Sequence, residues 1–161
     1  GRGYRRPGLL LRREHQMRFQ GRWEAGYAVA GGMLRGLRLA PAMYVDDWNQ
    51  PAPLLAWLKR EKPDVIITPA ADAIMGTLNR AGLHVPADIG LALLACPKLG
   101  DECSGIYQNG RLIGAYAIDA LISMVERNDR GLPAQATTLM VEGQWNEGRT
   151  LRPVPVPPGA A

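Results

Sequence analysis

Two short, wholly apolar runs constrain the fold of this chain more than any other feature of its sequence. They are the run Val65-Ile66-Ile67 and the run from Ile89 to Ala95. A strand without polar alternation has both faces buried, which is typical of a central strand in a parallel sheet. The rest of the chain should therefore provide layers on both faces of that sheet.

Helical and extended patterns alternate along the chain. Further strands are expected at residues 8–11, 42–45, 106–108 and 137–142, with a small extension at 144–145. Helices are expected at residues 14–34, 51–61, 72–81 and 109–127. Pro51, Asp72 and Asn109 suit helix starts, and Gly82 suits a helix end. We therefore predict an α/β fold, a three-layer sandwich with a mostly parallel sheet.

In such folds, ligands bind beyond the carboxyl ends of the strands. This rule points to the loops that follow the predicted strands, at residues 12–20, 46–50, 68–72 and 96–105. We expect any binding site of this chain to be built from these four loops.

The 161 residues suit one domain or slightly more, and the net charge of +4 comes from the amino end. Two interpretations are open for the basic residues there: a phosphate-contacting arm, or a solvated face of the first strand and helix. We favour the second, because few aromatic residues and no DNA-reading motif accompany these arginines. They are Arg2, Arg5, Arg6, Arg12, Arg13, Arg18 and Arg22.

Cysteine usage and hydropathy favour a cytoplasmic protein. Cys96 and Cys103 form neither a disulfide framework nor a C-x-x-C pair, so no metal or redox site is expected. No run of 18 apolar residues and no signal peptide is visible, so no membrane segment is expected. We predict no cofactor.

The sequence shows no catalytic residues that we can assign. Ser104 has no nucleophile-elbow motif around it, and His15 and His84 are not spaced for a shared metal. No glycine-rich dinucleotide or phosphate loop is present. A small α/β enzyme that uses Asp46, Asp47 or Asp72 remains as a minor alternative.

Five segments stand in an order and spacing that carry a family resemblance. The most specific is residues 81–89, at a helix-to-strand junction. The other four are residues 3–8, 63–66, 106–108 with the following Ile113-Gly114, and 142–145. Together they resemble the closing half of the effector-sensing domain of LacI/GalR-type (lactose-repressor-like) transcription regulators.

The resemblance implies a type I periplasmic-binding-protein-like lobe at residues 1–152, with residues 105–133 crossing to a first lobe and a Pro-rich flexible tail at 153–161. It implies an effector-sensing and dimerisation domain of a DNA-binding regulator, most simply a repressor. The helix-turn-helix that reads operator DNA, and most of the first lobe, would lie outside this chain. The expected partners are a small-molecule effector and a second copy, as a homodimer or a swapped oligomer. The alternative within the same fold is a solute-binding protein of a transport system.

The resemblance also assigns candidate site residues. The candidates for effector binding are Met17, Trp23, Trp48, Ala71, Asp72 and Cys96. The candidates for the dimer interface are Ile74, Met75, Leu78, Leu99 and Cys103. Trp23 and Cys96 stand where the family commonly has Arg and Asp, so we expect an effector less polar than a sugar, or a sensor without ligand control. The helix at 109–127 would lack its cover, so we also expect self-association or helix swapping.

Overall fold

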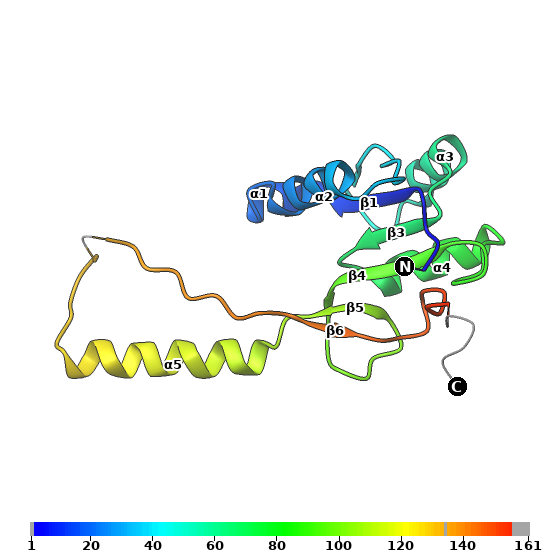
Figure 1. Cartoon of the computed structure of the whole chain (residues 1–161). Coiled ribbons are helices and arrows are strands. Elements are labelled where there is room, and N and C mark those ends of the chain that lie inside the picture. The colour runs from blue at the N-terminus through cyan, green and yellow to red at the C-terminus, as the bar shows by residue number, and fades with distance from the viewer. Residues whose placement is uncertain (1, 134, 156–161) are drawn as a thin grey trace, which may run out of the picture.

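A computed structural model describes residues 2–133 and 135–155 of the chain. Its centre is a six-stranded sheet in the order β2-β1-β3-β4-β5-β6 (Figure 1). The strands are β1 (Pro7–Arg12), β2 (Met43–Val45), β3 (Val65–Thr68), β4 (Gly90–Cys96), β5 (Ser104–Tyr107) and β6 (Gln144–Asn146). The helices are α1 (Arg13–Arg18), α2 (Arg22–Met33), α3 (Pro51–Glu61), α4 (Ala71–Arg80) and α5 (Gly110–Glu126).

The sheet is mostly parallel, as the apolar runs predicted. Strands β1 to β5 pair in parallel, and only β6 runs antiparallel, beside β5. The two wholly apolar runs form β3 and β4, which pair with each other near the middle of the sheet, with Ile66 opposite Leu91. The predicted α/β fold is therefore confirmed.

Helices cover both faces of the sheet. Leu10, Ile66 and Leu91 are fully buried on the face that α3 and α4 cover. The next residues along β1 and β3, Leu11 and Ile67, point to the opposite face, where α2 lies. Helix α3 begins at Pro51 and helix α5 is capped by the Asn109 side chain, as predicted from the sequence.

Three sequence-based predictions need correction. The helix expected at 14–34 is two helices, because Gln20 and Gly21 adopt positive φ angles of 52° and 69° and turn the chain between α1 and α2. Helix α4 begins at Ala71, so Asp72 lies in its first turn instead of capping it. Residues 137–142 form no strand, and the last strand is β6, which carries the residues expected only as an extension.

Residues 108–143, called the arm below, leave the lobe and return to it. Figure 1 shows α5 and the returning segment side by side, projecting away from the sheet. Tyr107 and Gln144 pair across β5 and β6, so the arm starts and ends at one point of the sheet edge. Of the described returning residues, 128–133 and 135–143, none forms a helix or strand. Within the part of the chain that the structure describes, no helix has the length and apolar character needed to cross a membrane.

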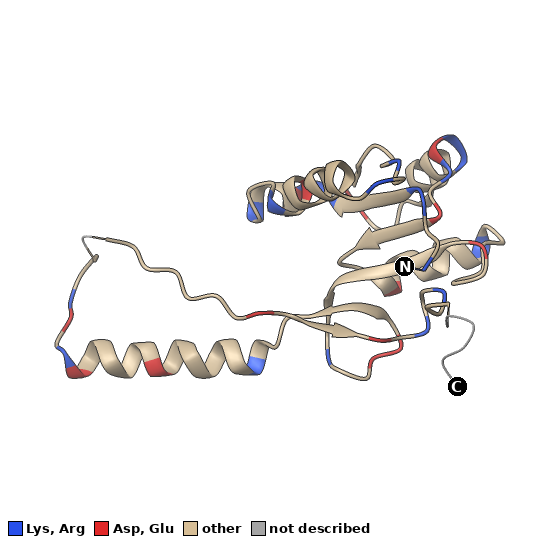
Figure 2. Ribbon diagram, in the orientation of Figure 1, with Lys and Arg blue, Asp and Glu red and all other residues tan. Residues whose placement is uncertain are grey.

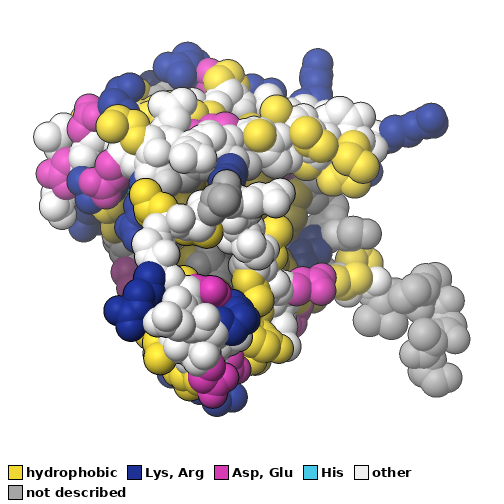
Figure 3. Space-filling view, turned by 90° about the vertical axis from the view of Figure 1, so that its left-hand side faces the viewer, with side chains coloured by type: hydrophobic (Ala, Val, Ile, Leu, Met, Phe, Trp, Pro, Cys, Tyr) yellow, Lys and Arg dark blue, Asp and Glu magenta, His cyan; other side chains and the backbone are white. Residues whose placement is uncertain are grey.

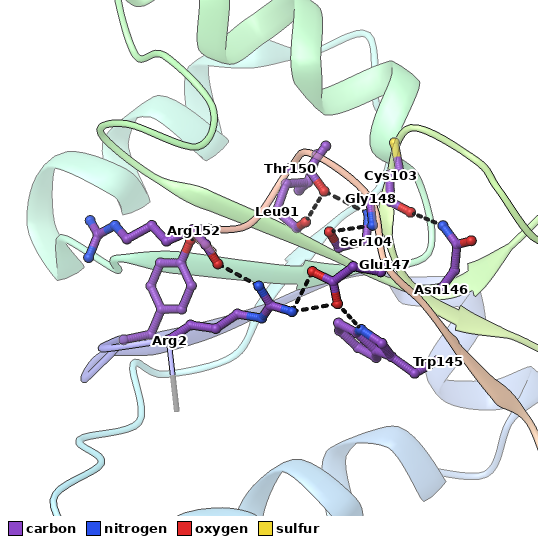
Figure 4. A network of polar contacts seen from close by, with 11 residues as sticks. Arg2, Leu91, Cys103, Ser104, Trp145, Asn146, Glu147, Gly148, Thr150 and Arg152 are labelled. Carbon is purple, nitrogen blue, oxygen red and sulfur yellow. Dashed lines mark hydrogen bonds and ion pairs between the residues drawn. The ribbon is translucent and has the colours of Figure 1, made fainter. Parts of the chain in front are cut away.

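A polar network, buried at Thr150 and exposed at Glu147, holds the residues after the arm against the lobe (Figure 4). The Thr150 hydroxyl donates to the carbonyl oxygen of Leu91 (2.6 Å) and accepts from the backbone N–H of Ser104 (2.8 Å). Arg2 donates to the Glu147 carboxylate, with one contact of 2.6 Å, and to the carbonyl oxygen of Arg152 (2.6 Å). The residues before β1 and those after β6 are thus joined to each other, although the arm does not pack on the lobe.

Candidate functional site

Aromatic side chains gather where β1 and β2 end, in two of the segments that the sequence indicated and on the neighbouring helix α2. The ring of His15 on α1 lies 5.7 Å from that of Trp23 on α2 and 6.4 Å from that of Trp48 in the loop after β2. Phe19 stacks on Trp23 at 4.1 Å. Trp23 and Trp48 are partly buried, and Trp48 also packs against the core. These four rings form an aromatic cluster that offers flat, partly exposed faces to an apolar or planar ligand.

His15, which the sequence analysis did not select, is at the centre of the aromatic cluster. Its Nδ1 accepts a hydrogen bond from the backbone N–H of Arg12 (3.2 Å), which requires a neutral ring with the proton on Nε2. Burial lowers the pKa of His15, and the nearby charges of Arg12 and Arg18 act in the same direction against Glu14. The ring therefore stays neutral at pH 7. The signal that could have found it is its place directly after the first strand.

A cavity of about 400 Å³ lies beyond the ends of β3 and β4. It brings together two predicted effector-binding residues, Ala71 and Asp72, and one predicted interface residue, Cys103. Its second carboxylate is Asp101, which the sequence analysis missed because nothing in its loop shows which side chain turns inward. Apolar side chains make up most of the remaining wall: Pro69, Ala70, Ala73, Leu93, Ala95 and Pro97.

The two cysteines beside this cavity are poor nucleophiles. Burial raises the pKa of Cys103 to about 11, and the carboxylates of Asp101 and Asp72 add to the shift. Burial also raises the pKa of Cys96, whose thiol donates to the carbonyl oxygen of Cys103 (3.6 Å). Both thiols stay protonated at pH 7 and lack the thiolate that nucleophilic catalysis needs. Cys96 is buried and is not part of the cavity wall.

A smaller cavity of about 290 Å³ lies between α2 and the sheet. Trp23, Arg22 and Tyr27 line it from the helix, and Leu94 lines it from β4. Because Leu93 faces the 400 Å³ cavity and successive strand residues point to opposite faces, the two cavities lie on opposite faces of the sheet. The Tyr27 hydroxyl donates to backbone carbonyl oxygens at 2.7 Å, and burial raises its pKa to about 12, so it is a structural anchor.

The remaining predicted residues lie in different surroundings. Met17 is 83% exposed on α1 and does not line either cavity. Ile74 and Leu78 are fully buried against the sheet of their own chain, so they offer no surface to a partner, a correction to the proposed interface. Leu99 is exposed, while Met75 is partly buried against the core. The dimer-interface prediction is kept for Met75, Leu99 and Cys103.

The charged groups at this edge are mostly paired within the chain. Arg13 contacts Asp46 at 2.9 Å, and Asp47 accepts from the backbone N–H of Asn49 at 2.9 Å. At the opposite end of the strands, Arg6 binds Glu61 at 3.0 Å. Figure 2 shows basic residues along β1, α1 and the chain that leads into them. Pairing with acids favours the solvated-face interpretation of these arginines over phosphate binding. Among the described residues there is no cluster of metal-ligating side chains.

A mostly parallel sheet with two cavities and an aromatic cluster near its carboxyl edge defines an α/β lobe with a candidate ligand site. Residues 1–151 match the family model of the periplasmic binding protein-like domain, so the chain belongs to this family. No curated protein sequence matches the chain.

Several solved structures with a similar fold are transcription regulators. The regulator CcpA of Lactococcus lactis is 13% identical with a TM-score of 0.58, over 92% of this chain and 56% of its own. A LacI-family regulator from Corynebacterium glutamicum is 18% identical with a TM-score of 0.64, over 94% and 60%. A Lac repressor dimer, bound to operator and the anti-inducer ONPF, is 16% identical with a TM-score of 0.64, over 93% and 54%. The chain thus spans little more than half the length of these proteins.

Proposed function

We propose that this chain is the second lobe of the effector-binding domain of a LacI-type transcription regulator, a non-enzymatic cytoplasmic protein. The observation that carries the proposal is the arm, which leaves the lobe after β5 and returns at β6. A two-lobed domain needs such a crossing segment, whereas a single-lobed α/β enzyme would fold the same residues back onto its sheet. The fold shared with a repressor seen on its operator supports the same assignment.

The effector of this lobe is a small molecule that is more apolar than a sugar. The aromatic cluster of His15, Phe19, Trp23 and Trp48 provides the stacking surface. Among the described residues, Asp72 and Asp101 are the acidic groups that line the 400 Å³ cavity, so they accept from hydroxyl or amine groups of the effector. Arg and Asp side chains that grip sugars in the family are replaced here by Trp23 and Cys96.

Thermal unfolding of the 161-residue chain tests this site. The probes are monosaccharides, disaccharides, purine nucleosides and aromatic amines, each at millimolar concentration. We expect a nucleoside or aromatic amine, and not a sugar, to raise the melting temperature. Trp48→Ala and Asp72→Asn should abolish that rise, and Asp88→Asn, in the turn at the other end of the sheet, should leave it unchanged. A rise that all three variants retain would contradict the site.

DNA binding separates the regulator from a transport-type solute-binding protein. We propose that a helix-turn-helix module and the rest of the first lobe belong to the same gene product, so the 161-residue chain alone should give no sequence-specific gel shift. The complete gene product should shift DNA from upstream of its own gene, and the effector should change that shift. A complete product with an export signal in place of the helix-turn-helix would establish the transport alternative.

A further inference from the structure

The tryptophans of this chain differ in how they use their indole N–H groups. Trp57 donates to a backbone carbonyl oxygen (2.9 Å), and Trp145 donates to a carboxylate (2.8 Å). Within the described residues, neither Trp23 nor Trp48 of the aromatic cluster donates to another group, and neither indole nitrogen is among the buried unpaired atoms. These two side chains are partly buried, and their indole N–H groups stay open to solvent. Both donors are therefore available to a molecule from outside the chain.

His15 adds a third donor to the aromatic cluster, and a hydrogen bond fixes the place of its proton. The backbone N–H of Arg12 donates to Nδ1 (3.2 Å), so Nδ1 carries no proton. Burial lowers the pKa of His15, so the ring is neutral at pH 7 and its one proton is on Nε2. No described residue accepts from Nε2. The buried unpaired side-chain atoms of the described chain are Arg12 Nε and Glu24 Oε2, so the Nε2–H of His15 is also open to solvent.

The hydrogen bond from Arg12 also directs the Nε2–H of His15 away from the sheet. The two nitrogens of an imidazole ring point to nearly opposite sides, and Nδ1 is turned toward Arg12, the last residue of β1. Nε2 therefore points away from the strand end, toward the region in which ligands of parallel α/β sheets bind. Figure 3 looks onto this side of the molecule and shows hydrophobic side chains exposed beside charged ones.

The acidic side chains near the aromatic cluster are engaged with other groups. Glu14 contacts Arg12 at 3.1 Å, and Asp46 contacts Arg13 at 2.9 Å. Asp47 accepts from a backbone N–H of its own loop at 2.9 Å. Within the described chain, none of these carboxylates accepts from the imidazole or from the two indole rings. The acceptors for the three ring N–H groups must therefore come from water or from a ligand.

We propose that the aromatic cluster binds a planar heteroaromatic ring with hydrogen-bond acceptors at its edge, and that the Nε2–H of His15 is the donor that orients this ring. The inference rests on the proposed function and narrows its effector to one chemical class. The rings of Trp23 and Trp48 supply the apolar contact area. Donors at the cluster and the carboxylates of Asp72 and Asp101 in the 400 Å³ cavity give the two parts of the site opposite hydrogen-bonding character.

Acceptors on the ligand decide how well it binds to this cluster. A ring without acceptors would stack on the tryptophans, but it would displace water from the N–H donors and leave them unpaired. Leaving a buried donor unpaired costs more free energy than a hydrogen bond ordinarily contributes. A ring nitrogen or carbonyl oxygen takes the place of that water and keeps the hydrogen bond. The cluster therefore selects ligands with acceptors at the ring edge over ligands of the same size that offer only donors.

Two probes of equal size test the need for an acceptor. Indole offers only an N–H donor, and 7-azaindole has an additional ring nitrogen that accepts. NMR titration of the 161-residue chain at pH 7 should show that 7-azaindole binds about two- to tenfold more tightly, as one net hydrogen bond provides. Without a donor in the site, desolvation of the ring nitrogen would make 7-azaindole the weaker ligand. Equal or weaker binding of 7-azaindole would overturn the inference and leave the stacking site intact, whereas binding of neither probe would overturn both.

A variant pair assigns the preference to His15. His15→Phe keeps an aromatic ring and removes the donor, so the preference for 7-azaindole should disappear while indole still binds. His84→Phe, in the turn before β4, where the His84 side chain is 79% exposed, is the matched control and should keep the preference. Circular dichroism checks that both variants fold. A preference that survives in His15→Phe would show that His15 is not the orienting donor.

The ring nitrogens of His15 give a readout that needs no variant. In ¹⁵N NMR spectra of the unliganded chain at pH 7, Nε2 should have the chemical shift of a protonated nitrogen and Nδ1 that of an unprotonated one. Addition of 7-azaindole should move the Nε2–H proton signal downfield, and addition of indole should not. The signals of the exposed His84 serve as the internal control and should respond to neither probe. A proton on Nδ1 in the unliganded chain, or the same response to both probes, would overturn the inference.

Discussion

The lobe and the arm of this chain both contain isoleucine and leucine side chains at regular spacing, but only the lobe buries them. In the lobe, Ile66, Ile74 and Leu78 are fully enclosed by β-strands and helices of the same chain. In the arm, Ile118 and Leu121 are about half exposed, although they follow an equally regular helical pattern. The difference lies in the connections. Helices α3 and α4 return to the sheet through the loops at residues 62–64 and 81–89, whereas α5 follows β5 and projects away from the sheet, and a long segment leads back from it to the edge strand β6.

This comparison indicates that the lobe is stable by its own packing, whereas the arm needs contacts with a further part of the protein or with a partner to bury its apolar side chains. Backbone hydrogen bonds of β3 and β4 are sheltered between two layers, so they open only when the lobe unfolds. The returning segment of the arm forms no strand and exposes Leu132 at 98% and Met140 at 87%. Its order therefore requires a partner that the lobe does not provide.

Amide hydrogen exchange should show the largest difference between the two regions. Amides of β3 and β4 should exchange more slowly than those of residues 135–143 by roughly three powers of ten or more. Mass spectrometry of peptic fragments measures both in one experiment, with α4 as a protected internal control. Strong protection of residues 135–143 in the isolated chain would break the comparison, because it would reveal a cover for the returning segment.

Truncation of a buried and an exposed isoleucine is expected to give the next largest contrast. Ile74→Ala should lower the free energy of unfolding by about 2–5 kcal/mol, since it leaves a cavity against the sheet. Ile122→Ala in the arm should change the stability of the lobe by less than about 0.5 kcal/mol. Urea denaturation below micromolar concentration, followed by tryptophan fluorescence, measures the lobe, because all four tryptophans of the chain lie outside the arm. Equal losses would mean that arm and lobe unfold as one unit.

Loss of the Thr150 hydrogen bonds to β4 and β5 should lower the stability of the lobe less than Ile74→Ala does. Thr150→Val removes a hydroxyl that bonds both Leu91 and Ser104, and leaves two buried backbone groups unpaired. This should destabilise the lobe by about 1–3 kcal/mol. Thr138→Val, in the exposed returning segment, is the matched control and should have no measurable effect. A neutral Thr150→Val variant would show that water or side-chain shifts satisfy these groups.

The contrast between lobe and arm also explains which features the sequence could predict. Each lobe element buries its pattern within the chain, so apolar runs, Pro51 and Gly82 located strands and helix ends correctly. Residues 137–142 carry an equally extended and apolar pattern, but a strand also needs a partner to pair with. The sequence pattern shows the tendency of a segment and not the presence of its partner, so the predicted strand is missing from the lobe.

The candidate site was predicted in its position and only partly in its residues. The rule for carboxyl ends of parallel strands indicated the loops that hold Trp48 and Asp72, whereas Trp23, on α2, was a candidate through the family resemblance alone. It could not find Asp101 or Phe19, because the inward turn of a loop side chain depends on tertiary packing. The family resemblance placed Ile74 and Leu78 at an interface, since one apolar helix stripe looks the same whether it faces a sheet or a partner.

The pH dependence of stability should give the smallest effect and should come from the lobe. Both histidines lie in the lobe, so the arm has no group that ordinarily titrates between pH 5.5 and 7.5. The pKa of His15 is lowered below its usual 6.5 in the folded chain, so the unfolded chain binds more protons as the pH falls through that range. Stability should therefore be full above pH 6.5 and decrease modestly toward pH 5.5. His15→Asn keeps an acceptor for the Arg12 N–H and should remove this decrease in thermal unfolding scans. A decrease that persists in His15→Asn would show that it does not come from the aromatic cluster.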